Sequence, residues 1–424
     1  MKFVLPVLSV LSVLSVLTLT SSLHALPPGD VALWEEDLEV YAQTLEARHI
    51  DLFHTRSQRE FETDLQALRR DLPRLTEAEL VTRLMEVHHR IGDGHTAIPL
   101  WERAYDRFPL DVEIVQGRAI LTGLGDDHAD MLGGEILSIN DRPIDEVLAR
   151  VFPVVPFTEN AGSDAVRVAA YLPVAPFLHA LGVSDTPDTL RLQVAQSGQT
   201  HTLTFRAGPR DAYSDALTHR LTYRDPLEDS MLEAVAPGLG FVYEADHQLG
   251  YIRFDRYPPA AEMDQFAREV VSVMRREGGR YLVIDLRDNY GGDFYTGLRL
   301  AHQLNLLDQV DWQSGVFVLT GPVTFSAAMS NAAQFSDILH ARRVGEPTGA
   351  TPCGYQDMGQ FNLPNSGLLI TYSKRHFCFA EPVDDALQPD HPVPVTVEHW
   401  RTGHDAAMDW VRAEVEDLST RDSR

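Results

Sequence analysis

The sequence predicts an α/β protein whose C-terminal half contains a mostly parallel sheet. From residue 240 onward, apolar segments of strand composition alternate with helical segments, which is typical of parallel strands joined by crossover helices. Two of these strands end in turns of small residues, at the edge where such sheets bind ligands. A chain of 424 residues is too long for one core, so two or three domains are expected.

The chain begins with a segment typical of an export signal. Lys2 precedes an apolar run over residues 3–20, and small residues lead to a cleavage point after Ala25. We assign residues 1–25 as a signal peptide and expect an exported protein, periplasmic or secreted. The alternative is an uncleaved membrane anchor, because the run approaches the length of a membrane span.

Residues 28–100 have the pattern of a helical domain. Apolar residues recur at helical spacing and predict the buried faces of its helices. The region ends in Gly92–Thr96 (GDGHT), whose glycines mark a helix end. The apolar positions are Leu38, Leu45, Phe61, Leu65, Leu68, Leu80, Leu84 and Val87.

Residues 101–207 predict a second domain of strands, interrupted by a Pro- and Ala-rich helical insert at Ile144–Leu181. Residues 208–239 are polar and contain three prolines, which indicates a linker. The third domain covers residues 240–424. Its expected strands are Leu249–Phe254, Tyr281–Leu286, Gly315–Leu319 and Ala341–Gly345, and its expected helices are Ala260–Arg276, Tyr295–Asn305 and Ala327–Phe335.

One turn of the third domain carries a candidate nucleophile, Ser326. In Val316–Phe335 (VFVLTGPVTFSAAMSNAAQF) the helical composition begins at Ala327, which places Ser326 at a helix N-terminus. The helix dipole stabilises negative charge there, and the N–H of Ala327 can bind an oxyanion. The simpler alternative is that Ser326 only caps the helix, a role that serine favours.

A second turn offers the complementary part of a hydrolytic site. Leu282–Phe294 (LVIDLRDNYGGDF) begins as a nearly continuous apolar strand, as expected when both faces are covered. Gly291 and Gly292 then allow backbone angles that other residues avoid, so their N–H groups can approach a substrate carbonyl. We predict an oxyanion hole formed by Gly291, Gly292 and Ala327.

These turns resemble those of the tail-specific, or C-terminal processing, serine peptidases, a family that includes the tricorn core protease and the interphotoreceptor retinoid-binding protein. IDLRDNYGG resembles the family's glycine turn, TFSAAMSNA its nucleophile turn and GEPTGA the turn that follows. Upstream, residues 34–96 resemble its N-terminal helical region, and residues 134–143 (GEILSINDRP) resemble half of a PDZ-like domain. The resemblance implies a crotonase/ClpP-like peptidase domain, a PDZ-like middle domain at 101–207 and serine endopeptidase activity. It also favours Ser326 as the nucleophile over Ser326 as a helix cap.

The general base departs from the Ser-Lys members of that family. They place a lysine a few residues after GEPT, where this chain has residues 349–352 (GATP), and the chain's only lysines are Lys2 and Lys374. Serine at neutral pH needs a base, and histidine suits this task. His95 in GDGHT matches the catalytic histidine of the tricorn branch, so we predict it as the base. Its alternative role is that of a structural histidine at a helix end.

The acid that orients His95 is less clear from the sequence. In the tricorn branch a serine before the histidine relays to a distant glutamate, but Gly94 occupies that place here. We favour Asp384, in a segment (AEPVDDALQPD) that resembles the family's final acidic turn. The other candidates are Asp93, Glu346, Glu381 and Asp385.

The two cysteines, Cys353 and Cys378, flank a segment with the composition of a β-hairpin and a turn signal at residues 364–367 (PNSG). Their midpoint falls within that turn, so they should face each other across the strands. Export to an oxidising compartment would allow a disulfide between them to persist. We therefore predict a disulfide, with two unrelated buried thiols as the alternative.

The net charge of −26 argues against nucleic acid and anionic membrane surfaces as partners. The expected partner is a peptide or protein substrate, and no metal or cofactor is expected. A PDZ-like module would bind an extended peptide by strand addition, although no carboxylate-binding loop is evident. Two other functions stay open: a non-catalytic binding protein on the same fold, and a crotonase-like acyl-transfer enzyme.

Overall fold

The computed structural model describes residues 25–224, 238–380 and 384–422. All but the last residue of the assigned signal peptide, and the candidate Glu381, lie outside these ranges. None of the helices within them is long and apolar enough to cross a membrane.

The N-terminal region forms three helices, α1 (Pro28–Arg48), α2 (Gln58–Asp71) and α3 (Glu77–His89). A short 3₁₀ turn, Leu72–Arg74, lies between α2 and α3. Capping boxes at Ser57 and Thr76 begin α2 and α3. All eight apolar positions expected to be buried are buried. The same core also includes Leu363, Leu368 and Ile370, so a distant hairpin completes it.

The middle region is an antiparallel sheet with strand order β1-β2-β3-β5-β6. Three helices between β4 and β5 occupy the predicted insert, and apolar residues of the sheet and insert form one core. The strands are β1 (Leu110–Val115), β2 (Arg118–Leu124), β3 (Glu135–Ile139), β4 (Arg142–Pro143), β5 (Thr189–Gln196), β6 (Gln199–Arg206) and β7 (His219–Arg220), and the helices are α4 (Ile144–Val151), α5 (Ala161–Tyr171), α6 (Ala175–Ala180) and α7 (Arg210–Ala216).

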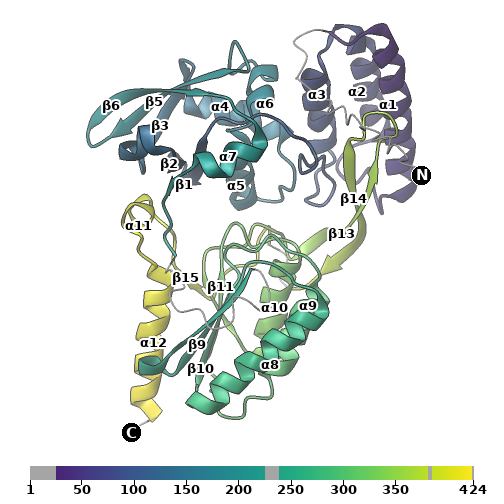
Figure 1. The fold of residues 1–424 in the computed structure, drawn as a ribbon. Helices are drawn as coiled ribbons and strands as arrows, with labels where there is room; N and C mark the ends of the chain where they lie inside the picture. Colours follow the sequence, from purple (N-terminus) through teal and green to yellow (C-terminus); the bar gives the residue numbers. More distant parts are fainter. Residues whose placement is uncertain (1–24, 225–237, 381–383, 423–424) are drawn as a thin grey trace, which may run out of the picture.

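The C-terminal region contains a six-stranded sheet of order β15-β12-β11-β10-β9-β8, parallel except for β8, which confirms the predicted α/β class. Helices α8, α9 and α10 contribute to the core on one face, and α12 packs on the other (Figure 1). The strands are β8 (Leu239–Glu244), β9 (Leu249–Phe254), β10 (Tyr281–Asp285), β11 (Val316–Thr320), β12 (Arg342–Gly345) and β15 (His391–Pro392), and the helices are α8 (Ala260–Glu277), α9 (Phe294–Leu304), α10 (Ala327–Leu339), α11 (Val397–Thr402) and α12 (Ala406–Asp422).

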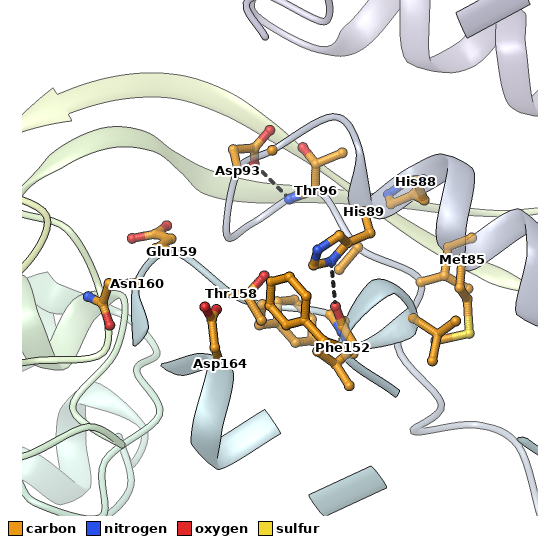
Figure 2. A pocket seen from close by; sticks show the side chains of 17 residues that line it. Met85, His88, His89, Asp93, Thr96, Phe152, Thr158, Glu159, Asn160 and Asp164 are labelled. Carbon is orange, nitrogen blue, oxygen red and sulfur yellow. Dashed lines mark hydrogen bonds between the residues drawn. The ribbon is translucent and has the colours of Figure 1, made fainter. Parts of the chain in front are cut away.

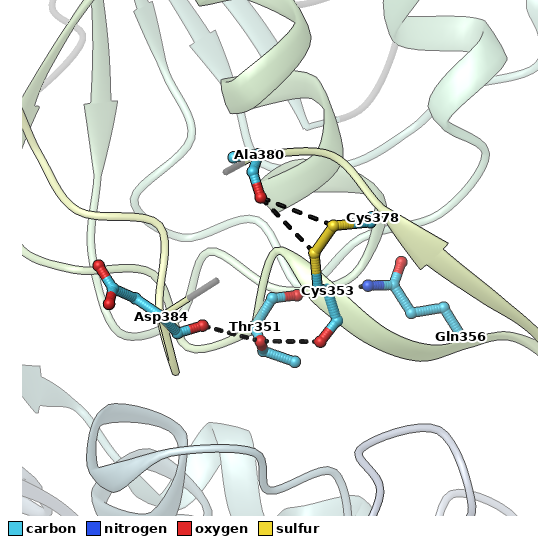
Figure 3. The surroundings of a disulfide bond; sticks show 6 residues. All are labelled: Thr351, Cys353, Gln356, Cys378, Ala380 and Asp384. Carbon is cyan, nitrogen blue, oxygen red and sulfur yellow. Dashed lines mark hydrogen bonds between the residues drawn. A yellow bond between two sulfur atoms is a disulfide. The ribbon is translucent and has the colours of Figure 1, made fainter. Parts of the chain in front are cut away.

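A long hairpin, β13 (Cys353–Asn362) and β14 (Leu369–Cys378), connects the C-terminal and N-terminal regions (Figure 1). Its register pairs Cys353 with Cys378, and the two cysteines form the predicted disulfide (Figure 3). At the opposite end, the buried carboxylate of Asp37 on α1 accepts the N–H groups of Asn365 and Ser366. The hairpin is therefore fixed at both ends.

Candidate active site

Ser326 and His95 are 231 positions apart in the sequence, and their side chains meet in the structure. The distance between Ser326 Oγ and His95 Nε2 is 2.8 Å, which is a hydrogen bond. The His95 ring is buried and stacks on Phe325, with ring centroids 5.5 Å apart. The imidazole is thus held in place beside the hydroxyl.

Ser326 has an unusual backbone conformation at the N-terminus of α10. Its φ is 51° and its ψ is −123°, a region that non-glycine residues rarely adopt. Ser326 occupies the cap position, yet its side chain makes no capping hydrogen bond and contacts His95 instead. Strain of this kind is commonly retained at functional sites, so this geometry favours the nucleophile over the simple cap.

Two buried polar residues, Thr324 and Asn289, hold the serine turn and the glycine turn together. Thr324 Oγ1 donates to the carbonyl of Leu286 and accepts the N–H of Gly321. Asn289 donates from Nδ2 to the carbonyl of Phe254, and its main-chain carbonyl accepts the N–H of Phe325. These bonds explain why the two turns lie next to each other at the carboxyl ends of β10 and β11.

The predicted oxyanion donors differ in what their N–H groups bind. The N–H of Gly291 donates to Asn289 Oδ1 at 2.8 Å, so it is already in use. Gly291 instead permits close approach, because a Cβ added there would lie 2.7 Å from Ser326 Cβ. Within the described ranges, the N–H groups of Gly292 and Ala327 have no acceptor.

The loop that carries His95 is held by Asp93 and by β14. Asp93 Oδ1 accepts the backbone N–H groups of His95 and Thr96, and its carboxylate also binds His49 and Ser373. The Thr371 hydroxyl on β14 donates to the carbonyl of His95 at 2.9 Å. Asp93 therefore fixes the backbone of the loop and not the His95 ring.

We expect Asp93→Asn to destabilise the protein in a pH-dependent way. Burial opposes ionisation of Asp93, but hydrogen bonds from His49, Ser373 and Thr96 outweigh it and lower its pKa to about 2. A depressed carboxylate pKa gives stability that is present above the ordinary pKa of about 3.9 and is lost as the pH falls through the folded value. Chemical unfolding of the wild type and the variant should therefore differ by about 2 kcal/mol at neutral pH, and the difference should shrink between roughly pH 4 and pH 2.

The exposed Asp188→Asn serves as the control for this experiment. It should leave the free energy of unfolding nearly unchanged at every pH. Equal effects of the two substitutions, or a difference that does not depend on pH, would contradict the role given to Asp93.

The carboxylate nearest the free side of His95 belongs to Glu159, which precedes α5. Its Oε1 lies 3.5 Å from His95 Nδ1, longer than a direct hydrogen bond but within ion-pair distance, and both side chains are buried. Its Oε2 accepts the N–H of Thr351 at 2.7 Å. A Cβ on Gly94 would lie 2.3 Å from Oε1, so glycine is needed there for Glu159 to approach. Figure 2 shows Glu159 and Asn160 below the loop that carries Asp93.

Three of the candidate acids identified from the sequence do not lie beside the His95 ring. Asp384 is exposed and contacts Thr351 only through its backbone carbonyl (Figure 3). Asp385 is also exposed, and Glu346 lines a different cavity, where burial raises its pKa. In the part of the chain that is described, none of these three carboxylates bonds to His95. Asp384 as the orienting acid therefore stays a prediction without a contact to support it.

Sequence reasoning missed Glu159 because nothing in its spacing relates it to Ser326 or His95. One weak indication existed: it is the only charged residue between Arg150 and Asp164. Lys374, the other candidate base, pairs with Asp357 at 3.1 Å and is not at the serine.

Ser326 opens onto a cleft of about 680 Å³ between the three regions. Trp101 and Tyr290 line it and are 53% and 48% exposed, and Tyr295 lines it with 62% exposure. Exposed aromatic side chains gathered in a concave site are typical of ligand-binding surfaces.

No protein-family model matches the chain. Among curated proteins, carboxyl-terminal-processing peptidase 2, chloroplastic, from Arabidopsis thaliana is 24% identical over 230 residues. That match covers 49% of this chain and 42% of the relative, so it spans less than half of the relative's length.

Solved structures share the fold over nearly the whole chain. A mutant of CPAF matches with a TM-score of 0.60 and 13% identity, covering 90% of this chain and 96% of that one. Mature CPAF complexed with lactacystin matches with a TM-score of 0.59 and 13% identity, covering 92% and 98%. Over part of its length the chain is therefore similar in sequence to a carboxyl-terminal-processing peptidase, and over most of its length it shares the fold of CPAF.

Proposed function

We propose that this chain is an exported serine endopeptidase of the tail-specific family that cleaves polypeptides through an acyl-enzyme at Ser326. The observation that carries the proposal is the 2.8 Å contact between Ser326 Oγ and His95 Nε2 at a helix N-terminus. A hydroxyl bonded to an imidazole is the arrangement that activates serine for nucleophilic attack.

The roles in the reaction follow from the contacts. The Ser326 hydroxyl donates to His95 Nε2 and gives up its proton as Oγ attacks the substrate carbonyl. The Nδ1 side of the ring faces Glu159, which stabilises the imidazolium that forms. The negative charge on the former carbonyl oxygen is bound by the N–H groups of Gly292 and Ala327, and by the dipole of α10. His95 then returns the proton to the leaving amine.

The remaining parts of the proposal concern architecture and location. We propose a signal peptide at 1–25, a helical domain at 28–100, a PDZ-like domain at 101–207, a linker at 208–239 and a crotonase/ClpP-like peptidase domain at 240–424. The two unused N–H groups beside an activated hydroxyl favour catalysis over a non-catalytic binding protein. A crotonase-like acyl-transfer enzyme would need an oxyanion hole but no Ser–His pair.

Glu159→Gln should lower kcat by roughly 10²- to 10⁴-fold, since orienting carboxylates of serine hydrolases have effects of this size. Glutamine keeps an oxygen that can accept the N–H of Thr351, so the loop should remain folded. The matched control is Asp384→Asn, which should leave kcat within about twofold because its carboxylate is exposed and unpaired in the described structure. Steady-state hydrolysis of a fluorogenic casein substrate measures both, and the opposite ranking would restore Asp384 as the orienting acid.

The physiological function is tested by a search for new C-termini. The active protein and Ser326→Ala are incubated separately with an extract of exported proteins, and C-terminal peptides are compared by mass spectrometry. Cleavage by the active protein alone supports an endopeptidase. Identical sets of C-termini in the two samples would contradict the proposal.

A further inference from the structure

Arg167 on α5 projects into the cleft beside the nucleophile. Its guanidinium carbon lies 4.5 Å from the centre of the Tyr290 ring and 5.4 Å from the centres of the Phe157 and Phe325 rings. Phe325 directly precedes Ser326, and Tyr290 directly precedes Gly291. The cation therefore lies close to the place where a scissile bond would bind.

Arg167 lacks the partner that a half-buried cation normally has. Within the described residues its one hydrogen bond runs from Nε to the carbonyl of Phe157, a long contact of 3.4 Å. No carboxylate of the described chain forms an ion pair with it, and burial lowers the pKa of its guanidinium. An unpaired charge withdrawn from water is costly, and a ligand that supplies the opposite charge removes that cost.

The carboxylates that line the cleft already have ion-pair or hydrogen-bond partners within the protein. Asp357 pairs with Lys374 and Arg375. Asp293 caps α9 by accepting the N–H of Tyr295. Among the described residues that line the cleft, Arg375 is exposed and shares Asp357 with Lys374, whereas Arg167 forms no ion pair with a carboxylate.

From this arrangement, and resting on the proposed function, we propose that Arg167 determines substrate specificity by binding a carboxylate of the peptide next to the scissile bond. Carboxylates come from two sources in a peptide: an acidic side chain and the free C-terminus. Both present the same planar pair of oxygens, which matches the planar fork of N–H groups on a guanidinium.

The geometry of the cleft suits this binding mode. The aromatic rings contact the guanidinium through its faces, where cation–π attraction operates, and leave N–H groups at its edge for hydrogen bonds. Phe157, which contributes one of these rings, has a φ of 61°, a strained value for a bulky residue. The net charge of −26 repels acidic substrates at long range, so an acidic preference would have to come from a local cation.

The test compares matched decapeptides with the wild type, Arg167→Gln and Arg167→Lys. One set carries Glu or Gln at each position in turn, and another carries a free or an amidated C-terminus. Fluorescence anisotropy of labelled peptides with the corresponding Ser326→Ala proteins measures binding without cleavage, and hydrolysis by the active proteins measures kcat/KM. Arg150→Gln on neighbouring α4, whose exposed side chain pairs with Glu146, is the control of equal charge change.

We expect the affinity and kcat/KM of the wild type to be about tenfold or more higher for the carboxylate peptide than for its matched neutral peptide, because hydrogen bonds to charged groups are strong. Arg167→Gln should abolish that preference, Arg167→Lys should keep part of it, and Arg150→Gln should keep all of it. The set in which the preference appears identifies the acidic side chain or the C-terminus as the source. The absence of any carboxylate preference in the wild type, or its persistence in Arg167→Gln, would overturn the inference.

The failure of this inference can be told apart from a failure of the proposed function. Labelling by a serine-reactive fluorophosphonate reports on Ser326 and does not require a carboxylate. If the wild type labels normally and shows no carboxylate preference, only the role of Arg167 is wrong. If it does not label but binds carboxylate peptides through Arg167, the specificity site stands and the peptidase assignment is wrong.

Discussion

Ser326→Ala is expected to abolish hydrolysis while leaving the fold intact. Removal of the nucleophile from a serine hydrolase lowers kcat by roughly 10⁴- to 10⁶-fold. The substitution removes one oxygen from a partly buried side chain, and the bonds that hold its turn come from the Thr324 hydroxyl and the main-chain carbonyl of Asn289. The wild type and the variant should therefore have similar thermal unfolding curves and very different rates on casein. Ser330→Ala on the same helix is the control, since its hydroxyl only donates to the carbonyl of Ser326.

His95→Ala is expected to have the second largest effect, nearly as large as that of Ser326→Ala. Members of one catalytic unit are strongly non-additive, so the double variant should be no slower than Ser326→Ala alone. Lys374→Met should change the rate by less than about threefold, because this exposed lysine only pairs with Asp357. A large loss in Lys374→Met together with a small one in His95→Ala would move the general base to the lysine.

The parts of the site that lie in local patterns could be predicted from the sequence. Ser326 follows a strand and precedes a helix, and His95 lies in a compact glycine turn, so each has a motif of its own. The disulfide was also predictable, because a hairpin's register follows from its turn, and the structure pairs Cys353 with Cys378.

Glu159 was not predictable, since its position depends on three segments that meet only after folding. The missing side chain of Gly94 gives it space, the N–H of Thr351 holds one oxygen, and the insert before α5 delivers it. The N–H of Gly291 donates to the Asn289 side chain. The orientation of that side chain cannot be read from the sequence. Arg167 was not predictable for a related reason, because the sequence does not show whether an arginine has an ion-pair partner in the folded protein.

The roles assigned to Ser326, His95 and the oxyanion donors remain predictions that the geometry favours. The most direct test is to treat the folded protein with a fluorophosphonate and to locate the adduct by peptide mass spectrometry. We predict one adduct, on Ser326, that is lost in Ser326→Ala, forms much more slowly in His95→Ala and is absent from denatured protein. An adduct on another residue, or no adduct on the folded wild type, would contradict the claim that Ser326 is an activated nucleophile.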